Sequence, residues 1–178
     1  MMDMHATTVI GIVRNGKAAM AADGQVTLGD TIVKNTAKKL RRLYSGSVLV
    51  GFSGAGADAF ALVERLEEKL ENARGNLPRA ALELAREWRS DKYLRHLDAL
   101  IAAVDSEHAL LIGGAGEIVE PEDGIVAVGS GHAYALAAAR ALDAHTTMSP
   151  ASIARNAIMI ASEICIFTGG CIQVEELD

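Results

Sequence analysis

The chain has few cysteines, prolines and aromatic residues, and it lacks a long apolar run. Of its 178 residues, 2 are cysteine, 3 are proline and 4% are aromatic. Cys165 and Cys171 form neither a CxxC pair nor a zinc-type spacing, so we interpret both as reduced thiols. No segment approaches the roughly 20 apolar residues that cross a bilayer, and residues 1–6 lack the basic and apolar parts of a secretory signal. We therefore expect a cytoplasmic protein with no membrane association.

Basic residues are not in excess either. Lysine and arginine total 17 against 23 acidic residues, and a formal charge of -6 argues against a nucleic-acid partner. The 5 histidines are scattered without metal-ligand spacing, which favours surface or helix-end positions. Gly129-Ser130-Gly131 resembles the start of a phosphate-binding turn, but Tyr134 replaces the next glycine. The sequence therefore favours neither a zinc site nor a nucleotide site.

What the chain does have is a large aliphatic content. Half of the residues are hydrophobic, mostly alanine and branched aliphatics, which is enough for one compact domain. Asn15-Gly16 lies between two β-prone runs and predicts a type I′ hairpin, because that turn needs positive φ at both central residues. Both runs are nearly continuously apolar, so we expect their sheet to be covered on both faces.

The order of elements predicts an α+β fold. A polar loop is expected from Asp23 to Thr31, and helices are expected to end near Gly75 and to begin after Asn76 and Ser149. The strands come in hairpin-connected groups, which favours two antiparallel sheets between helix layers over a βαβ repeat. The expected strands lie near residues 9–13, 18–22, 32–33, 48–52, 99–104, 109–112, 117–119, 125–128 and 171–174, and the helices near 60–75, 76–88, 132–144 and 150–164.

The short segment Ala6-Thr7-Thr8 could have a catalytic role besides starting a strand. Thr7 and Thr8 follow Ala6 at the start of the first strand, where threonine is ordinary. If the bond between Ala6 and Thr7 were cut, Thr7 would carry a hydroxyl and a free α-amine that titrates near pH ~8. One residue would then supply both the nucleophile and the general base. Such a site also needs a cation, an acid that holds it and backbone N–H groups for an oxyanion, for which Lys39, Asp23 and Gly51 are candidates.

The sequence as a whole resembles the HslV (ClpQ) family of proteasome β-subunit-like peptidases. The resemblance runs from Thr7 nearly to the C-terminus. It is carried by Ala6-Thr7-Thr8, Asn15-Gly16, residues 23–29 (DGQVTLG), 38–43 (KKLRRL), 51–54 (GFSG), 57–60 (ADAF), 87–92 (EWRSDK), 129–131 (GSG) and 164–168 (ICIFT). It implies an N-terminal-nucleophile hydrolase fold, a four-layer αββα sandwich, which agrees with the order of elements above.

The resemblance also implies a role for each of five residues. Thr7 resembles the nucleophile, Lys39 the cation that tunes it and Asp23 the acid that positions Lys39. Ser130 resembles a hydrogen-bonding partner near the free amine, and Gly51 resembles the oxyanion N–H donor. From the residues alone, Asp23 and Lys39 would be interpreted as a turn carboxylate and part of a solvated basic face.

Further implications concern a cation, the assembly and activation. The family binds sodium through backbone carbonyls, and the matching positions are Ser162, where many relatives have glycine, Cys165 and Thr168. Two stacked hexameric rings are implied, with the HslU (ClpY) AAA+ ATPase as partner and no organic cofactor. Six residues precede Thr7, so we expect a propeptide of residues 1–6 and a peptidase domain of residues 7–178. Residues 169–171 depart from a more polar segment that is common in relatives.

The resulting hypothesis is a threonine endopeptidase subunit that degrades unfolded proteins fed by the ATPase. Cleavage after Ala6 would activate it, and access to the chamber would control it, since the sequence indicates no pronounced specificity pocket. Two alternatives remain open from the sequence. One is an N-terminal-nucleophile amidohydrolase acting on a small amide, and the other is a noncatalytic ring subunit that keeps its N-terminus uncut.

Overall fold

Two antiparallel sheets stacked face to face form the centre of the molecule. The structure is a computed structural model that describes residues 4–5, 7–54, 56–97 and 99–177. One sheet has the strand order β11-β2-β3-β12 and the other β10-β9-β8-β7-β6. The first contains β11 (Ile125–Gly129), β2 (Thr8–Arg14), β3 (Lys17–Asp23) and β12 (Ile172–Leu177). The second contains β10 (Ile118–Val119), β9 (Ala109–Gly113), β8 (Ala99–Val104), β7 (Val48–Gly54) and β6 (Leu40–Leu43).

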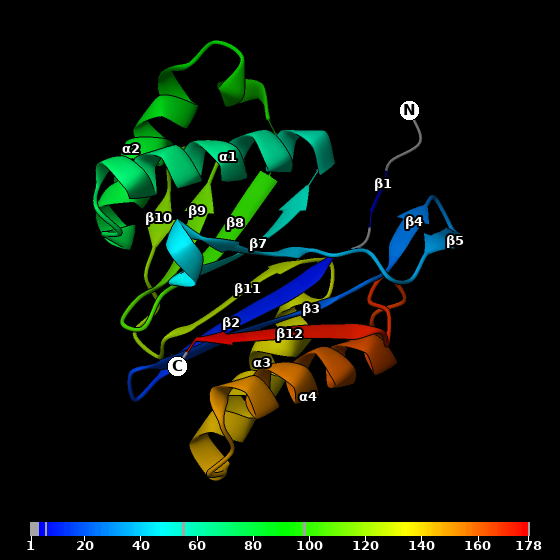
Figure 1. The fold of residues 1–178 in the computed structure, drawn as a ribbon. Coiled ribbons are helices and arrows are strands. Elements are labelled where there is room, and N and C mark those ends of the chain that lie inside the picture. The colour runs from blue at the N-terminus through cyan, green and yellow to red at the C-terminus, as the bar shows by residue number, and fades with distance from the viewer. Residues whose placement is uncertain (1–3, 6, 55, 98, 178) are drawn as a thin grey trace.

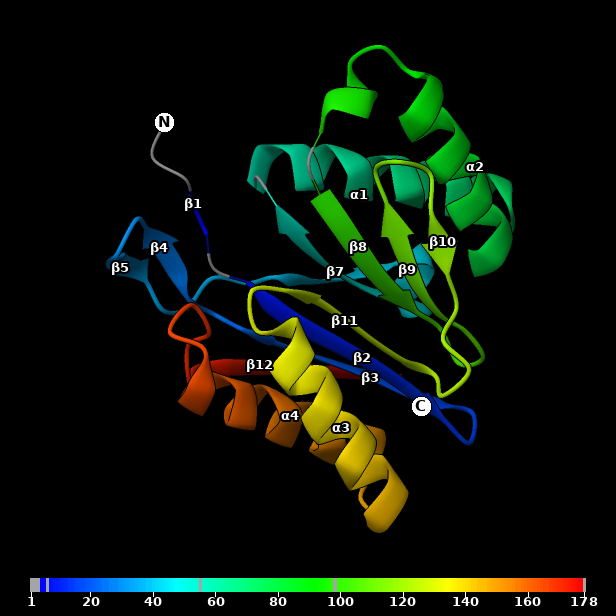
Figure 2. The same ribbon diagram turned by 180° about the vertical axis from the view of Figure 1, so that it is seen from behind.

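Helices cover the outer face of each sheet (Figures 1 and 2), so the predicted α+β sandwich of four layers is confirmed. Helices α1 (Gly56–Asn72) and α2 (Leu77–Ser90) pack on the five-stranded sheet, and α3 (His132–His145) and α4 (Pro150–Ile164) pack on the four-stranded one. Asn76 and Ser149 cap α2 and α4 through their side chains, as the sequence predicts. Short 3₁₀ turns lie at Tyr44–Gly46 and Leu94–His96.

The first hairpin supplies the central strands of the four-stranded sheet. Asn15 and Gly16 have φ values of 54° and 75°, which confirms the predicted turn. The apolar residues of β2 and β3 are buried on both faces, as expected from their continuous hydrophobicity. One face packs against the other sheet and the other face against α3 and α4. The hairpin therefore holds Thr8 at one end of β2 and Asp23 at the end of β3, next to each other.

A third, small sheet is the main difference from the sequence-based expectation. Residues 23–31 were expected to be a loop, but β4 (Val26–Leu28) lies within them and pairs with β5 (Thr31–Lys34). The other neighbour of β4 is β1 (Met4–His5), which belongs to the expected propeptide. The segment is short and polar, and its strands are defined by pairing with one another, which single-segment periodicity does not show. The last strand is also longer than expected, ending at Leu177.

Two other expectations bear on the described residues. No helix in the described part of the chain is long and apolar enough to cross a membrane. Cys165 is buried and Cys171 is exposed, and both are free thiols, as the sequence predicts.

Candidate active site

Asp23 and Lys39 form a buried ion pair beside the start of β2. The side chain of Asp23 is fully buried and that of Lys39 is 6% exposed, and Lys39 Nζ lies 2.9 Å from Asp23 Oδ1. The Asp23 carboxylate also accepts hydrogen bonds from the backbone N–H groups of Thr8, Gln25 and Gly169, at 2.7, 2.8 and 3.1 Å. A buried charge is tolerated when it is paired and hydrogen-bonded in this way. The surface interpretation of the two residues is therefore wrong.

The Lys39 ammonium is held by a backbone carbonyl as well as by Asp23. Besides the bond to Asp23, Nζ donates to the backbone carbonyl of Gln25 at 2.6 Å. Burial lowers the pKa of Lys39 below its ordinary value, and the Asp23 carboxylate opposes this through its charge and its hydrogen bond. Lys39 is thus a fixed, largely dehydrated cation whose proton is easier to remove than that of a surface lysine.

Thr7 lies next to the turn that joins β11 to α3. Its backbone carbonyl accepts a hydrogen bond of 2.8 Å from Ser130 N–H. Gly129 has a φ of 97°, and a Cβ there would lie 1.8 Å from the Thr7 carbonyl oxygen, so only glycine allows this approach. Gly131 N–H donates to Thr8 Oγ1 at 2.9 Å. The Gly129-Ser130-Gly131 turn therefore clamps the first two residues of the expected peptidase domain and is not a phosphate-binding turn.

The loop after α4 closes the opposite side of the same region. Thr168 Oγ1 lies 2.7 Å from Thr8 Oγ1 within hydrogen-bonding distance, and a Cβ at Gly131 would lie 2.4 Å from Thr168 Oγ1. Gly169 N–H reaches Asp23, and Gln25 Nε2 donates to the carbonyl of Ile166 at 2.9 Å. Residues that are about 140 to 160 positions apart in sequence thereby hold one another around the start of β2.

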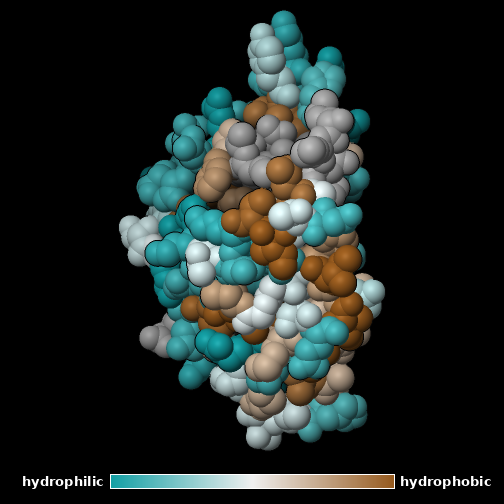
Figure 3. Space-filling view, turned by 90° about the vertical axis from the view of Figure 1, so that its right-hand side faces the viewer, coloured by the Kyte–Doolittle hydropathy of each residue, from teal (hydrophilic) through white to brown (hydrophobic). Residues whose placement is uncertain are grey.

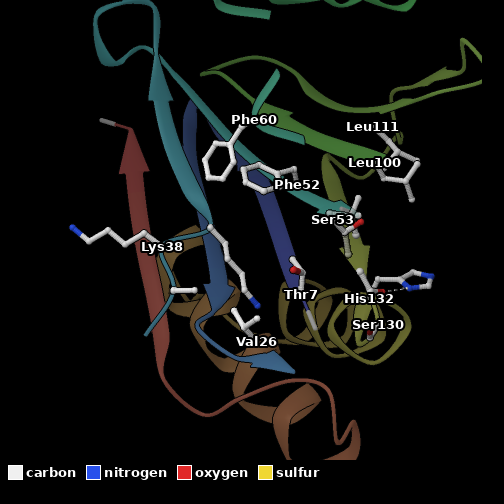
Figure 4. A pocket seen from close by; sticks show the side chains of 16 residues that line it. Thr7, Val26, Lys38, Phe52, Ser53, Phe60, Leu100, Leu111, Ser130 and His132 are labelled. Carbon is white, nitrogen blue, oxygen red and sulfur yellow. Dashed lines mark hydrogen bonds between the residues drawn. The ribbon is translucent and has the colours of Figure 1, made fainter. Parts of the chain in front are cut away.

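A cavity of about 540 Å³ opens beside Thr7. Its described lining consists of Thr7, Val26, Ala37, Lys38, Lys39, Phe52, Ser53, Gly54, Phe60, Leu100, Leu111, Ala127, Val128, Gly129, Ser130 and His132. In Figure 4, Thr7 lies between Val26 and Lys38 on one side and Ser130 and His132 on the other. The sequence indicated no specificity pocket, because the wall is assembled from side chains on separate strands, loops and helices.

Two aromatic rings form part of the cavity wall. The rings of Phe52 and Phe60 meet edge to face, with their centroids 5.3 Å apart. The Arg41 guanidinium lies 5.2 Å from the Phe60 centroid, within cation–π range. These contacts fix an apolar surface close to Thr7 that is suited to an apolar side chain of a bound peptide.

Three of the five predicted catalytic residues line this cavity, and the other two lie next to lining residues. Thr7, Lys39 and Ser130 are lining residues, and Asp23 is hydrogen-bonded to Lys39. Gly51 precedes Phe52, the first residue of β7 that lines the cavity. It pairs across the sheet with Leu40, which follows Lys39 in the sequence. A Cβ at Gly51 would lie 2.5 Å from Val9 Cγ1, so the glycine lets β7 pack closely on β2.

The three predicted cation ligands lie in and after the last turn of α4. Ser162 is in that turn, and Cys165 N–H donates to the carbonyl of Ala161. The last four carbonyls of a helix have no partner within the helix, and they carry the negative end of its dipole. The Cys165 carbonyl accepts the N–H of Thr168 at 2.9 Å, which curls the chain back at this point. A turn rich in carbonyl oxygens at a helix C-terminus has the donor chemistry of a sodium site.

Sequence reasoning did not identify the lining residues Phe52, Phe60 and His132 as site residues. His132 was assigned to a surface or helix-end position, which its place at the start of α3 confirms, but it also lines the cavity. Its position two residues after Ser130, a predicted site residue, is the feature of the sequence that could have identified His132 as a lining residue. Among the described residues, no group of three or more His, Cys, Asp or Glu side chains is placed to hold a metal ion.

Comparisons with known proteins show the family to which the chain belongs. A family model described as proteasome subunit matches residues 4–177. The ATP-dependent protease subunit HslV of Chlorobium luteolum is 58% identical over 98% of this chain and 96% of its own length. The HslV subunit of a Geobacillus species is 57% identical over 99% of this chain and all of its own length. The crystal structure of HslV from Trypanosoma brucei superposes with a TM-score of 0.90 at 42% identity, covering 96% of this chain and 99% of the other.

Proposed function

The chain belongs to the HslV group of the proteasome family, the proteolytic subunits of an ATP-dependent protease, and we propose on that premise that Thr7 is its catalytic nucleophile. The observation that carries the proposal is the position of Thr7 in a cavity next to the buried cation of Lys39. Fixed charges in a site from which water is largely excluded stabilise developing charge better than surface charges do.

The chemistry begins once Thr7 has a free α-amine. Thr7 Oγ1 attacks the scissile carbonyl, and its proton passes to the α-amine and then to the leaving amine of the substrate. The product is an acyl-enzyme ester and a released peptide with a new amino terminus. Water then attacks the ester, returning its hydrogen to Thr7 Oγ1 and releasing the carboxylic acid. Gly51 is proposed to donate its backbone N–H to the oxyanion in both steps.

Lys39 and Asp23 are proposed to prepare the nucleophile. The cation of Lys39 favours the deprotonated forms of the nearby hydroxyl and amine. Asp23 and the Gln25 carbonyl hold Lys39 in one position, so that its charge is in place before the substrate arrives. Ser130 is proposed to hydrogen-bond near the free amine, which is supported by its backbone bond to the Thr7 carbonyl.

Activation is proposed to require cleavage between Ala6 and Thr7. In the uncut chain the nitrogen of Thr7 is part of a peptide bond and is not basic, so the general base is missing. Pairing of Met4 and His5 with β4, whose Val26 lines the cavity, supports an extended path for the residues before the cut. The cut removes residues 1–6 and leaves 178 − 6 = 172 residues.

The assembly and the cation complete the proposal. Two stacked hexameric rings with inward-facing sites are proposed, together with the HslU AAA+ ATPase that an ATP-dependent protease requires and unfolded proteins as substrates. Sodium is proposed to bind the backbone carbonyls of Ser162, Cys165 and Thr168, and it would neutralise the partial negative charge of this turn. These residues would thereby hold the loop that hydrogen-bonds Asp23 and Thr8.

A substitution at Thr7 tests the proposal. Thr7→Ala should abolish hydrolysis of an unfolded protein in the presence of the ATPase and ATP, because it removes the only proposed nucleophile. The variant should also keep residues 1–6 if the cut is autocatalytic, which intact-mass measurement of the purified protein detects. Thr147→Ala, at an exposed threonine between α3 and α4, is the matched control and should behave as the wild type.

Other outcomes would favour the alternatives. Proteolysis by Thr7→Ala at the wild-type rate would overturn the mechanism. A wild-type ring that retains residues 1–6 and shows no hydrolysis would support the noncatalytic scaffold. Hydrolysis of small amides without fragments from an unfolded protein would support the amidohydrolase.

A further inference from the structure

His132 is the one histidine that lines the cavity, among the described residues, and neither the mechanism nor the assembly uses it. It is the first residue of α3, two positions after Ser130. Its ring Nδ1 lies 2.7 Å from the carbonyl oxygen of Gly129, the glycine that contacts the Thr7 carbonyl. The turn that clamps Thr7 thus also fixes the His132 ring.

The hydrogen bond to Gly129 determines how the ring can interact. A carbonyl oxygen only accepts, so Nδ1 carries a proton in this contact. The other ring nitrogen, Nε2, is left for a ligand and becomes a charged donor when the ring gains a second proton. Because the bond from Nδ1 already restricts rotation of the His132 side chain, less conformational entropy is lost when Nε2 binds a ligand.

The position of the ring points to a substrate side chain instead of the reacting carbonyl. In Figure 4 the His132 ring lies on the same side of Thr7 as Ser130, which is also the side of Leu100 and Leu111. Val26 and Lys38 lie across Thr7 from it. A peptide whose scissile bond sits at Thr7 therefore extends past His132 on one side only.

The charge of the cavity selects the kind of side chain. The ionisable groups among the described lining residues are Lys38, Lys39 and His132, all of them basic. Lys39 is neutralised by Asp23, whereas Lys38 and His132 are both exposed and line the cavity on opposite sides of Thr7. A carboxylate near His132 would meet favourable potential and a charged hydrogen-bond donor.

We propose that His132 is a specificity-determining residue that favours an acidic substrate side chain on the Ser130 side of the scissile bond. The inference rests on the proposed function, since it takes Thr7 as the reacting residue. It adds a polar preference on one side of Thr7 to the apolar surface of Phe52 and Phe60.

Paired peptides test the inference in the assembled protein with its ATPase. Each pair differs by a single glutamate or glutamine at one position, and successive pairs move that position along both sides of the scissile bond. The ratio of kcat/KM for the two members is measured at about pH 6, within the range where histidine side chains gain their charge. We expect a preference for glutamate of roughly two- to fivefold at one or more positions, and the positions at which it depends on His132 should all lie on one side of the scissile bond, whereas Lys38 acts on the other side.

Two variants make the result specific. In His132→Asn the amide N–H can still donate to the Gly129 carbonyl, but the counterpart of Nε2 is missing, so the ratio should fall to about one. His145→Asn, at an exposed histidine on the other end of α3, should keep the wild-type ratio. Raising the ionic strength with choline chloride at constant sodium should reduce the wild-type ratio, because salt screens exposed charges.

The inference is overturned if the wild-type ratio is one at every position, or if His132→Asn keeps the wild-type ratio. Both results are compatible with Thr7 as the nucleophile, because they concern only the preference between glutamate and glutamine. If the proposed function itself were wrong, Thr7→Ala would hydrolyse the same peptides, which separates that failure from a failure of the inference about His132.

Discussion

Gly129 shows how one residue without a side chain can determine the geometry of the proposed nucleophile, Thr7. Its φ of 97° is strained for other residues, and a Cβ would lie 1.8 Å from the Thr7 carbonyl oxygen. The atom in contact is a backbone oxygen, which cannot avoid the added Cβ by a change of rotamer as a flexible side chain could. The turn and Thr7 would therefore have to separate if any other residue stood at this position.

The variant Gly129→Ala should accordingly lose activity as well as stability. A shift of about 1 Å in a reacting group costs on the order of 100-fold in rate, so we expect at least that loss in kcat/KM for peptide hydrolysis. Gly46→Ala is the matched control, because Gly46 has a similar φ of 91° but nothing lies within 4 Å of its added Cβ. Both variants should lose about 1–2 kcal/mol of unfolding free energy from backbone strain. Equal activity of the two variants would contradict the role of Gly129.

The proposed catalytic residues differ in how far the sequence predicts them. Thr7 is ordinary at the start of a strand, and chemistry distinguishes it only if the bond after Ala6 is cut, because a residue that becomes N-terminal combines the two functions. The contact between Asp23 and Lys39 was inferred from the resemblance, since their separation of 16 positions matches no local period. The pair forms because the hairpin and the start of β6 bring them together in the core. Long-range packing of this kind leaves no signal in either segment.

At the scale of elements, predictions held where local chemistry defines the ends. The Asn15-Gly16 turn and the caps Asn76 and Ser149 each depend on a few adjacent residues, and all three were predicted. Strand β4 was missed because it has three residues and its partners β1 and β5 are also short. Such strands are stabilised by their neighbours more than by their own propensity.

The end of α4 and the loop that follows it give a prediction about sodium. Replacing sodium chloride with choline chloride at equal ionic strength should lower the melting temperature. Sodium at about 100 times its dissociation constant would contribute about 2.7 kcal/mol to the unfolding free energy. Activity should fall in parallel, because the loop contacts Asp23 and Thr8.

Calorimetry in the two salts measures this effect. Thr168→Val removes the hydroxyl that contacts Thr8 but keeps the proposed carbonyl ligand, so it should retain the sodium response while being less stable. An identical melting temperature of the wild type in both salts would rule out a sodium site that matters for the fold.

At the scale of the whole molecule, the small sheet stands apart from the sandwich. The β4–β5 hairpin projects beside the start of the chain (Figures 1 and 2), and every residue of β5 is exposed. Ile32 and Val33 are 52% and 56% exposed, and apolar side chains gather on the face seen in Figure 3. An exposed apolar edge strand is prone to pair with other chains unless a partner covers it. In the proposed rings, the expected partner is a neighbouring copy of this chain.

A charge in this hairpin should therefore prevent ring assembly without unfolding the subunit. Val33→Asp places a carboxylate where the interface would have to bury it, and an unpaired buried charge costs several kcal/mol. We expect sedimentation velocity to show smaller species, while circular dichroism shows an unchanged content of helix and strand. Val119→Asp is the matched control, since Val119 is 47% exposed on β10, at the far edge of the five-stranded sheet. Intact rings of Val33→Asp would show that neighbouring copies meet through another surface, and dissociation of both variants would show that the hairpin has no special part in assembly.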